Sequence, residues 1–184
     1  MKTVKARGGM LIHTVRFVDE RFGADAHGEV VATLPAASVT ALSSHLRDSS
    51  WVPVTHLVAY MEGAKALFAP EDATFFRRVG FYSGQLGRTE GGFGPMVATP
   101  ETANRLASTL WRAFFDTGRL VIESVARKSA VLRVHDFPTS RTLCQRIEGS
   151  MAGLLSSEAR EVHVEQSACV VDGSPYCEMR ARWD

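Results

Sequence analysis

Three cysteines in the C-terminal part of the chain are the residues best suited to chemistry. Cys144, Cys169 and Cys177 are all the cysteines of the 184-residue sequence. Cys169 and Cys177 flank a turn signal centred on Gly173, so a hairpin there places them on opposed strands and on one sheet face. Opposed Cβ atoms lie ~4.5–5.5 Å apart, close enough for both thiolates to share a tetrahedral zinc ion. The same spacing also allows a disulfide or inert buried thiols.

A metal site there needs further ligands from neighbouring elements. Cys144 begins an amphipathic segment, and a helix packed on the cysteine face of the hairpin would bring its thiolate to the other two. Glu123 and His135, on the preceding hairpin, can reach as a fourth ligand. Glu165 cannot, because it lies about 13 Å along the strand from Cys169 at ~3.3 Å per residue. With four protein ligands the zinc site is closed and structural rather than catalytic.

The elements that must position these residues follow from apolar periodicity and cap signals. Helical spacing and caps predict helices over residues 10–22, 27–34, 38–46, 53–68, 70–87 and 99–118. The period then changes, which predicts two hairpins that flank a helix over 140–155, with strands over 120–125, 130–135, 161–171 and 176–183. This order indicates an α+β fold, with several helices packed on a four-stranded antiparallel sheet. In the helix over 140–155, Gly149 and Gly153 allow close approach of a neighbour.

The predicted organisation is a single ligand-binding domain. We expect a flexible N-terminus over residues 1–9 and one domain over residues 10–184. The domain divides into a helical part, 10–118, and a hairpin–helix–hairpin part, 119–184. A chain of 184 residues is long enough to bury a substantial core.

A set of aromatic residues on the predicted helices is a second candidate site. Most aromatic residues of this kind belong to the core, but an apolar pocket between helices and sheet would use the same side chains. His56 could supply a polar contact there, although a lone histidine is more often a surface or core residue. The predicted ligand-binding residues are Phe75, Phe76, Tyr82, Trp111, Phe115 and His56.

Composition and motifs restrict the function classes. The formal net charge of +1 gives no basic excess for nucleic acid, and no apolar run approaches the ~20 residues of a membrane span. Three cysteines, with no secretory leader pattern, indicate a reducing cytoplasm. There is no nucleophile elbow, zinc-protease motif or dinucleotide fingerprint, so we assign no catalytic residue and favour a non-catalytic protein.

A resemblance to a known family adds to these expectations. The strand VHVEQSAC and the turn DGSPYCE resemble the C-terminal signature of the 4-vinyl reductase domain family, over about 40 residues. That family is similar to the TRAPP-subunit and haem-NO-binding-associated folds. The resemblance implies helices on a four-stranded sheet, a homodimer, and a zinc site with three cysteines and an upstream glutamate. On this chain those ligands correspond to Cys144, Cys169, Cys177 and, less securely matched, Glu123.

The expected function is therefore sensory. We expect a stand-alone cytoplasmic domain that binds a hydrophobic or aromatic small molecule, contains structural zinc and signals through a partner protein. One alternative is a non-catalytic adaptor, like TRAPP subunits. The other is an accessory protein or reductase in tetrapyrrole metabolism, which the family name suggests but no nicotinamide or flavin motif supports.

Overall fold

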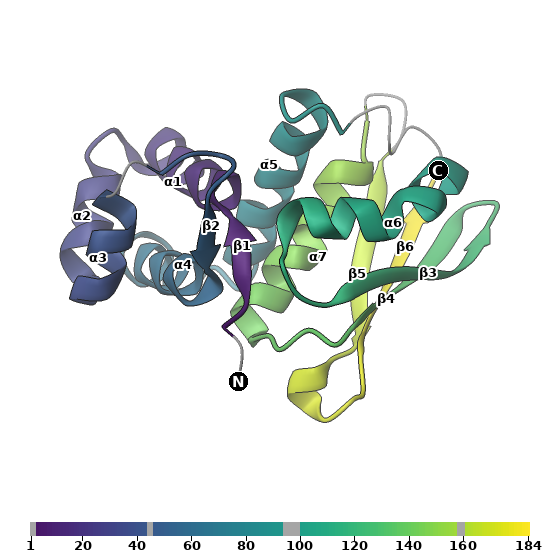
Figure 1. Cartoon of the computed structure of the whole chain (residues 1–184). Coiled ribbons are helices and arrows are strands. Elements are labelled where there is room, and N and C mark those ends of the chain that lie inside the picture. The colour runs from purple at the N-terminus through teal and green to yellow at the C-terminus, as the bar shows by residue number, and fades with distance from the viewer. Residues whose placement is uncertain (1–2, 44–45, 94–99, 158–160) are drawn as a thin grey trace.

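The first half of the chain forms a layer of helices closed by a short ladder. The computed structural model describes residues 3–43, 46–93, 100–157 and 161–184. The strand β1 (Lys5–Arg7) pairs antiparallel with β2 (Trp51–Pro53). Between and after these strands lie α1 (Gly8–Phe22), α2 (Ala26–Thr33), α3 (Ala36–Ser43) and α4 (Val54–Phe68), which gather at one side of the molecule (Figure 1).

The second half forms a sheet with helices against one face. Helices α5 (Phe75–Thr89) and α6 (Pro100–Phe114) precede the hairpin β3 (Arg119–Ala126) and β4 (Ser129–His135). Helix α7 (Arg141–Leu155) then leads to β5 (Val162–Ala168), the short 3-10 helix η2 (Val170–Asp172) and β6 (Cys177–Trp183). The strands form an antiparallel sheet in the order β3-β4-β6-β5. The α+β prediction with a four-stranded sheet is therefore confirmed.

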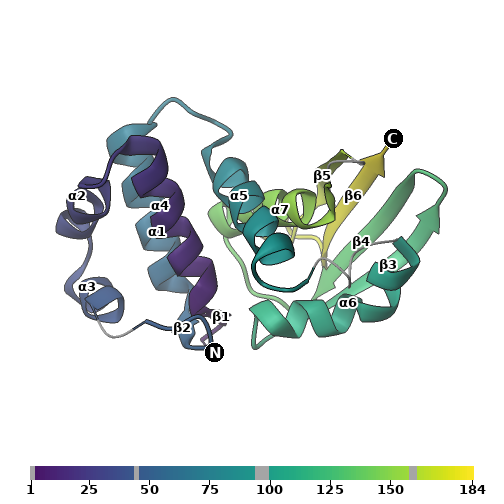
Figure 2. The ribbon, with the colours of Figure 1, turned by 90° about the horizontal axis from the view of Figure 1, so that it is seen from above.

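Alternation along the strands decides which face of the sheet is covered. Leu132 and Val134 of β4 are buried, as are Cys177 and Met179 of β6, whereas the intervening Arg133 and Glu178 carry charge and form an ion pair. The buried side chains face α6 and α7, which lie on the same side of the sheet (Figure 2). Both helices can therefore place side chains over the inner face of β4 and β6, and β6 carries Cys177.

Helices α5 and α7 approach each other closely because both carry glycine at the crossing. A Cβ at Gly80 would collide with the carbonyl oxygen of Arg146, and one at Gly149 would collide with that of Arg77. Gly153 makes an equally close approach to the carbonyl oxygen of Phe81. The glycines thus allow backbone-to-backbone packing, as predicted for the helix over 140–155. This packing fixes α7 in the middle of the molecule, between α5 and the sheet (Figure 2).

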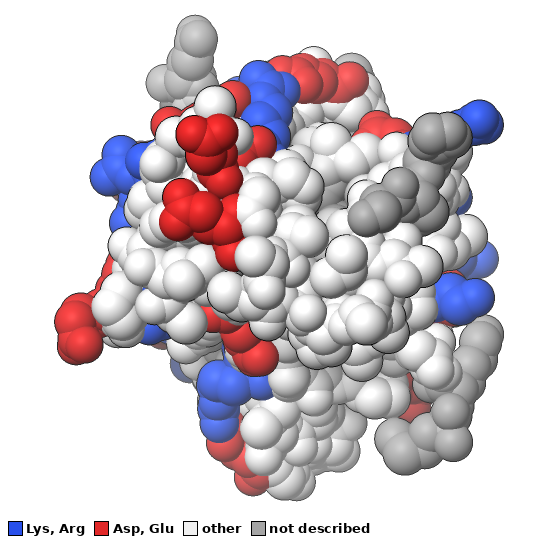
Figure 3. Space-filling model, turned by 90° about the vertical axis from the view of Figure 1, so that its left-hand side faces the viewer, with Lys and Arg blue, Asp and Glu red and all other residues white. Residues whose placement is uncertain are grey.

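Charged side chains are unevenly distributed over the surface of the N-terminal helices. On the face formed by the N-terminal helices, Asp and Glu gather at one upper edge and Lys and Arg are scattered at the rim (Figure 3). Within the described residues, none of the helices combines the length and the apolar character that crossing a bilayer requires.

Two boundaries differ from the sequence predictions for identifiable reasons. Residues 5–7 form β1 rather than a flexible start, because their backbone pairs with β2. In this ladder Lys5 lies opposite Pro53 and Arg7 lies opposite Trp51. Helix α5 begins at Phe75 rather than Pro70, since the Asp72 carboxylate accepts the Thr74 backbone N–H at 2.8 Å and forms a turn there.

Candidate functional site

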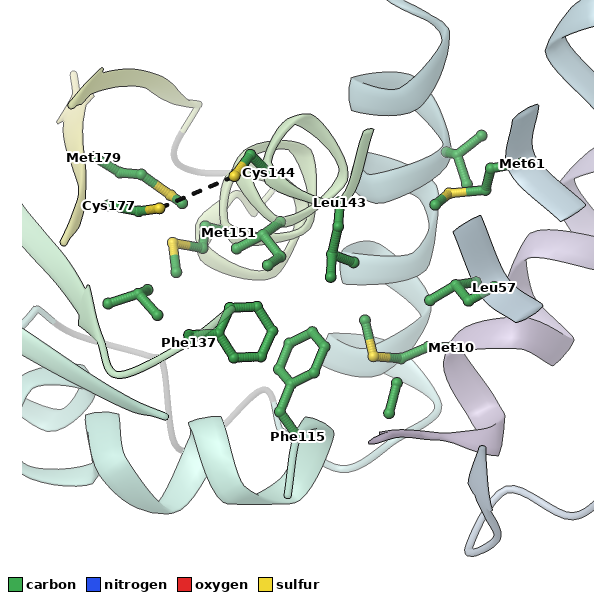
Figure 4. Close-up of a cluster of buried hydrophobic side chains, with 14 of the residues drawn as sticks. Met10, Leu57, Met61, Phe115, Phe137, Leu143, Cys144, Met151, Cys177 and Met179 are labelled. Carbon is green, nitrogen blue, oxygen red and sulfur yellow. Dashed lines mark hydrogen bonds between the residues drawn. The ribbon is translucent and has the colours of Figure 1, made fainter. Parts of the chain in front are cut away.

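The three cysteines converge: Cys169 and Cys177 meet as their spacing predicted, and α7 brings Cys144 to the same face. The Sγ atom of Cys144 lies 3.4 Å from that of Cys169 and 4.0 Å from that of Cys177, and the last two are 3.8 Å apart. All three are buried free thiols. Cys144 on α7 points toward Cys177 on β6, next to Met179 (Figure 4). Metal binding by this thiol cluster stays a prediction.

Local structure explains the convergence. Ser140 caps α7 by accepting the Leu143 backbone N–H at 3.3 Å, so Cys144 lies in the first turn of the helix. Cys169 follows the end of β5 and Cys177 begins β6, with Gly173 in the left-handed conformation between them. The hydrogen bond with the Cys177 thiol lowers the pKa of Cys144 to about 6, and the same contact raises the pKa of Cys177. One thiolate can therefore be shared among S–H donors of the cluster.

Glu123 is not brought to the thiol cluster. Its carboxylate lies 3.6 Å from Arg133 Nη1 and 3.9 Å from His135 Nε2. Arg133 also pairs with Glu178, which alternates with the inward-facing Cys177 and Met179 on β6. Glu123 and His135 therefore belong to a charged network on the outer face of the sheet, so the predicted fourth ligand is in the wrong place.

The predicted ligand-binding aromatics divide between two regions. Phe75 packs on Phe17, Phe22 and Phe76, and Tyr82 packs on Phe17, all within the core of the N-terminal helices. His56 lies with these helices too, with its Nδ1 3.0 Å from the Ser38 hydroxyl. None of these residues lines the cavity described next.

Trp111 and Phe115 do line an interior cavity. It has a volume of about 100 Å³ and lies between α5, α6, α7 and the inner face of the sheet. Its wall includes buried residues such as Met10 and Phe115 and also Val125, which is 37 % exposed. The cavity therefore leads from the core toward the surface. Its apolar wall includes Ala107, Leu110, Leu132, Ile147 and Met151.

A buried arginine is the one charged side chain in the described wall of this cavity. Arg146 is 0 % exposed, and burial lowers its pKa to about 9. It donates hydrogen bonds to the Met10 carbonyl at 3.0 Å and to the hydroxyls of Ser83 and Ser150 at 3.1 and 3.3 Å. No carboxylate among the described residues forms an ion pair with it, and its Nε finds no acceptor there. The guanidinium is therefore a buried charge with neutral partners only.

Sequence reasoning missed Arg146, although a signal was present. Arg146 lies three residues after Leu143, four before Ser150 and beside Ile147, so it falls within the apolar stripe of α7. A charged residue in such a stripe indicates a buried charge with a special role. The nearby Glu148, also buried, has an ordinary explanation, because it accepts from Arg77 at 2.9 Å.

Comparison with known proteins identifies the fold. No protein-family model and no curated protein matches the sequence. Among solved structures, similar ones are H-NOX (heme NO/oxygen-binding) proteins. An Fe(II) unliganded mutant from K. algicida has a TM-score of 0.71 at 10% identity, covering 97% of this chain and 96% of its own. The S. oneidensis protein in the Fe(II)NO ligation state has 0.68 at 10%, covering 97% and 99%.

A third similar structure is an oxygen-binding H-NOX domain related to soluble guanylate cyclases, with a TM-score of 0.66 and 11% identity over 97% of this chain and 95% of its own. These findings overturn the resemblance to the 4-vinyl reductase domain family and the TRAPP-like assignment. They also overturn structural zinc as the expected cofactor, because heme is the group associated with the similar structures.

The described wall of this cavity does not fit a heme, however. Heme iron is held by His, by Cys, by Tyr, or by Met together with His. The described cavity wall has no His, Cys or Tyr, and Met10 and Met151 are its only sulfur-containing side chains. Its volume of about 100 Å³ is also below the ~300–1,000 Å³ of ordinary ligand pockets. The chain thus has the fold of H-NOX domains, and the described wall of its interior cavity carries an arginine and none of the His, Cys or Tyr side chains that hold heme iron.

Proposed function

We propose that the chain is a small-molecule-binding sensor domain whose ligand occupies the cavity between α5, α6, α7 and the sheet. The observation that carries this proposal is the cavity, which is apolar, interior and extends to partly exposed residues. The fold supports a sensory role, because a similar structure is an oxygen-binding domain related to soluble guanylate cyclases. In this chain the ligand binds to protein side chains directly.

The position of the cavity suggests how binding is transmitted. Its wall takes residues from α6 and from the sheet, such as Trp111 of α6 and Leu132 of β4. A ligand that contacts both favours the arrangement in which they are held together, and shifts the population toward it. The signal then passes to a partner protein. The homodimer, the downstream partner and the cytoplasmic location stay predictions.

Filling the cavity tests this function. Ala107 is buried on α6 and lines the cavity, so Ala107→Leu places a larger side chain in the binding space. Ala113→Leu, on the same helix but outside the described cavity wall, is the matched control. We expect toluene to bind wild type and Ala113→Leu and to raise the free energy of unfolding by about 2.7 kcal/mol at 100 times Kd. Ala107→Leu should lose this effect, as measured by calorimetric titration and thermal unfolding.

Two results would count against the proposal. Equal toluene binding by wild type and Ala107→Leu would place the ligand elsewhere. Stoichiometric binding of hemin, with an absorption spectrum of axially ligated iron, would show that the chain holds heme despite the wall that it presents. Native mass spectrometry of the full chain gives an independent readout, since a co-purified small molecule should be present in wild type and reduced in Ala107→Leu.

A further inference from the structure

The donors of Arg146 are incompletely used. A guanidinium has five N–H donors. Nη2 donates twice, to Met10 and Ser83, and Nη1 donates once, to Ser150. Nε and the second N–H of Nη1 have no acceptor in the described part of the chain. All the groups that bind the guanidinium also line the cavity, so the unsatisfied charge lies in the cavity wall.

A buried charge in this state is costly. Buried charged groups are normally paired or fully hydrogen-bonded, because removal from water costs several kcal/mol per ion. The nearest titratable neighbour in this network is His13, whose Nδ1 lies 3.2 Å from the Ser83 hydroxyl. Burial lowers the pKa of His13, and an imidazole is neutral or positively charged, so His13 supplies no negative charge. The counter-charge that would stabilise the guanidinium is therefore not provided by the described residues.

We propose that the cavity binds a small apolar molecule that carries one carboxylate, and that Arg146 binds this carboxylate. The proposal rests on the proposed function and adds the chemical class of the ligand. Carboxylate is the acceptor that matches a guanidinium best, through short charge-assisted hydrogen bonds. The hydroxyls of Ser83 and Ser150, which already accept from Arg146, can donate their own protons to the same group.

The cavity sets the size of the apolar part. Its volume of about 100 Å³ is of the order of an engineered ~150 Å³ apolar cavity that binds benzene. One ring or a short chain is therefore appropriate. Trp111 and Phe115, whose ring centroids are 4.6 Å apart, line the cavity and suit an aromatic ring. The inferred ligand class is small aromatic or short-chain carboxylates.

Matched probes test the inference on the full chain. Benzoate carries the carboxylate, benzamide has the same shape without charge, and toluene lacks the polar group. We expect wild type to bind benzoate most tightly in calorimetric titrations at pH 7. Arg146→Met should weaken benzoate binding about 30-fold, the scale for losing one partner of a buried charged pair, and leave toluene binding within about two-fold. Arg182→Met, on the exposed side of β6, is the control and should change neither.

The possible outcomes distinguish a failure of the carboxylate assignment from a failure of the proposed ligand-binding function. If none of the three probes binds wild type, the proposed function fails and the ligand class fails with it. If toluene binds but benzoate is no tighter than benzamide, only the carboxylate assignment is overturned. A retained preference for benzoate in Arg146→Met overturns it as well. Should that variant fail to fold, Arg146→Lys serves instead: it keeps the charge, and is expected to keep a reduced preference for benzoate.

Discussion

The two buried polar regions of helix α7 are only two residues apart, yet they differ in how their polar groups are matched. At the start of the helix, the Cys144 thiol contacts two other thiols, and the cluster satisfies itself. Arg146 has a full charge, neutral acceptors and a cavity beside it. The thiol cluster needs nothing from outside the chain to be stable, whereas the guanidinium does. The difference indicates which region is built for a ligand.

The largest expected effect comes from a substitution in α7 that disturbs both regions together. Gly149→Ala places a Cβ against the carbonyl oxygen of Arg77, which is backbone and cannot turn away. The helices α5 and α7 must separate, and we expect a loss of about 3 kcal/mol in the free energy of unfolding, measured by denaturant titration. Gly28→Ala on α2, where a Cβ meets no atom within 4 Å, is the control and should stabilise by up to about 1 kcal/mol. Equal effects at the two positions would show that close packing is not required.

Removing a thiol should cost stability. Cys144→Ala leaves a small void between α7 and the sheet and removes a hydrogen-bond partner of the Cys169 and Cys177 thiols. We expect a loss of about 1.5 kcal/mol in thermal or denaturant unfolding. Val171→Ala, close to Cys169 in sequence but 45% exposed, should change stability by less than about 0.5 kcal/mol. A stable Cys144→Ala protein would mean that the cluster is not a packing element.

Removing the guanidinium should have the opposite sign. Without ligand, Arg146→Met replaces a buried charge by an apolar side chain of similar length. We expect unfolding free energy at pH 7 to be unchanged or higher by about 1 kcal/mol, since isolated buried charges oppose folding. A loss like that of Cys144→Ala would contradict the comparison, because it would show that the three hydrogen bonds of Arg146 more than offset its burial.

The stability of the arginine region should also depend on pH above pH 8. Burial lowers the pKa of Arg146 to about 9, below its ordinary value of 12.5, so the unfolded chain binds more protons between these values. Stability should therefore rise with pH through this window, as the folded protein loses the buried charge. We expect the unfolding free energy of wild type to rise relative to that of Arg146→Met from pH 8 to pH 10.5. A constant difference would show that Arg146 stays protonated throughout.

The sequence predicted local features well and contacts between distant elements poorly. The convergence of Cys169 and Cys177 depends on one hairpin with a turn glycine, so local rules sufficed there. Cys144 could be added only on the condition that its helix packs on the same face of the sheet. The prediction that Glu123 reaches the cysteines was wrong, because alternation along β3 places its side chain on the outer face of the sheet. A bulge between Ile122 and Ser124 shifts the register of β3 at this position.

The apolar periodicity of the sequence could not predict which helices contact one another. An apolar stripe shows that Phe75 and Tyr82 are buried but not which neighbours they meet, and both belong to the N-terminal core. Arg146 and its cavity need α1, α5, α6, α7 and the sheet to be placed together, since its acceptors come from Met10, Ser83 and Ser150. Met10, Ser83 and Ser150 show no special pattern in their own segments of the sequence. They become neighbours of Arg146 only when the chain has folded.

The short strand β1 has a consequence for the order of folding. Besides its ladder with β2, its residue Ala6 forms a bridge with Phe115, and the Lys5 backbone N–H donates to the Asp116 carboxylate at 2.8 Å across 111 positions of sequence. A chain leaving the ribosome cannot complete these bonds until Phe115 and Asp116 have been synthesised, since Asp116 follows Lys5 by 111 positions. Closing so long a loop is slow, so the earliest residues should be among the last to acquire protection from hydrogen exchange.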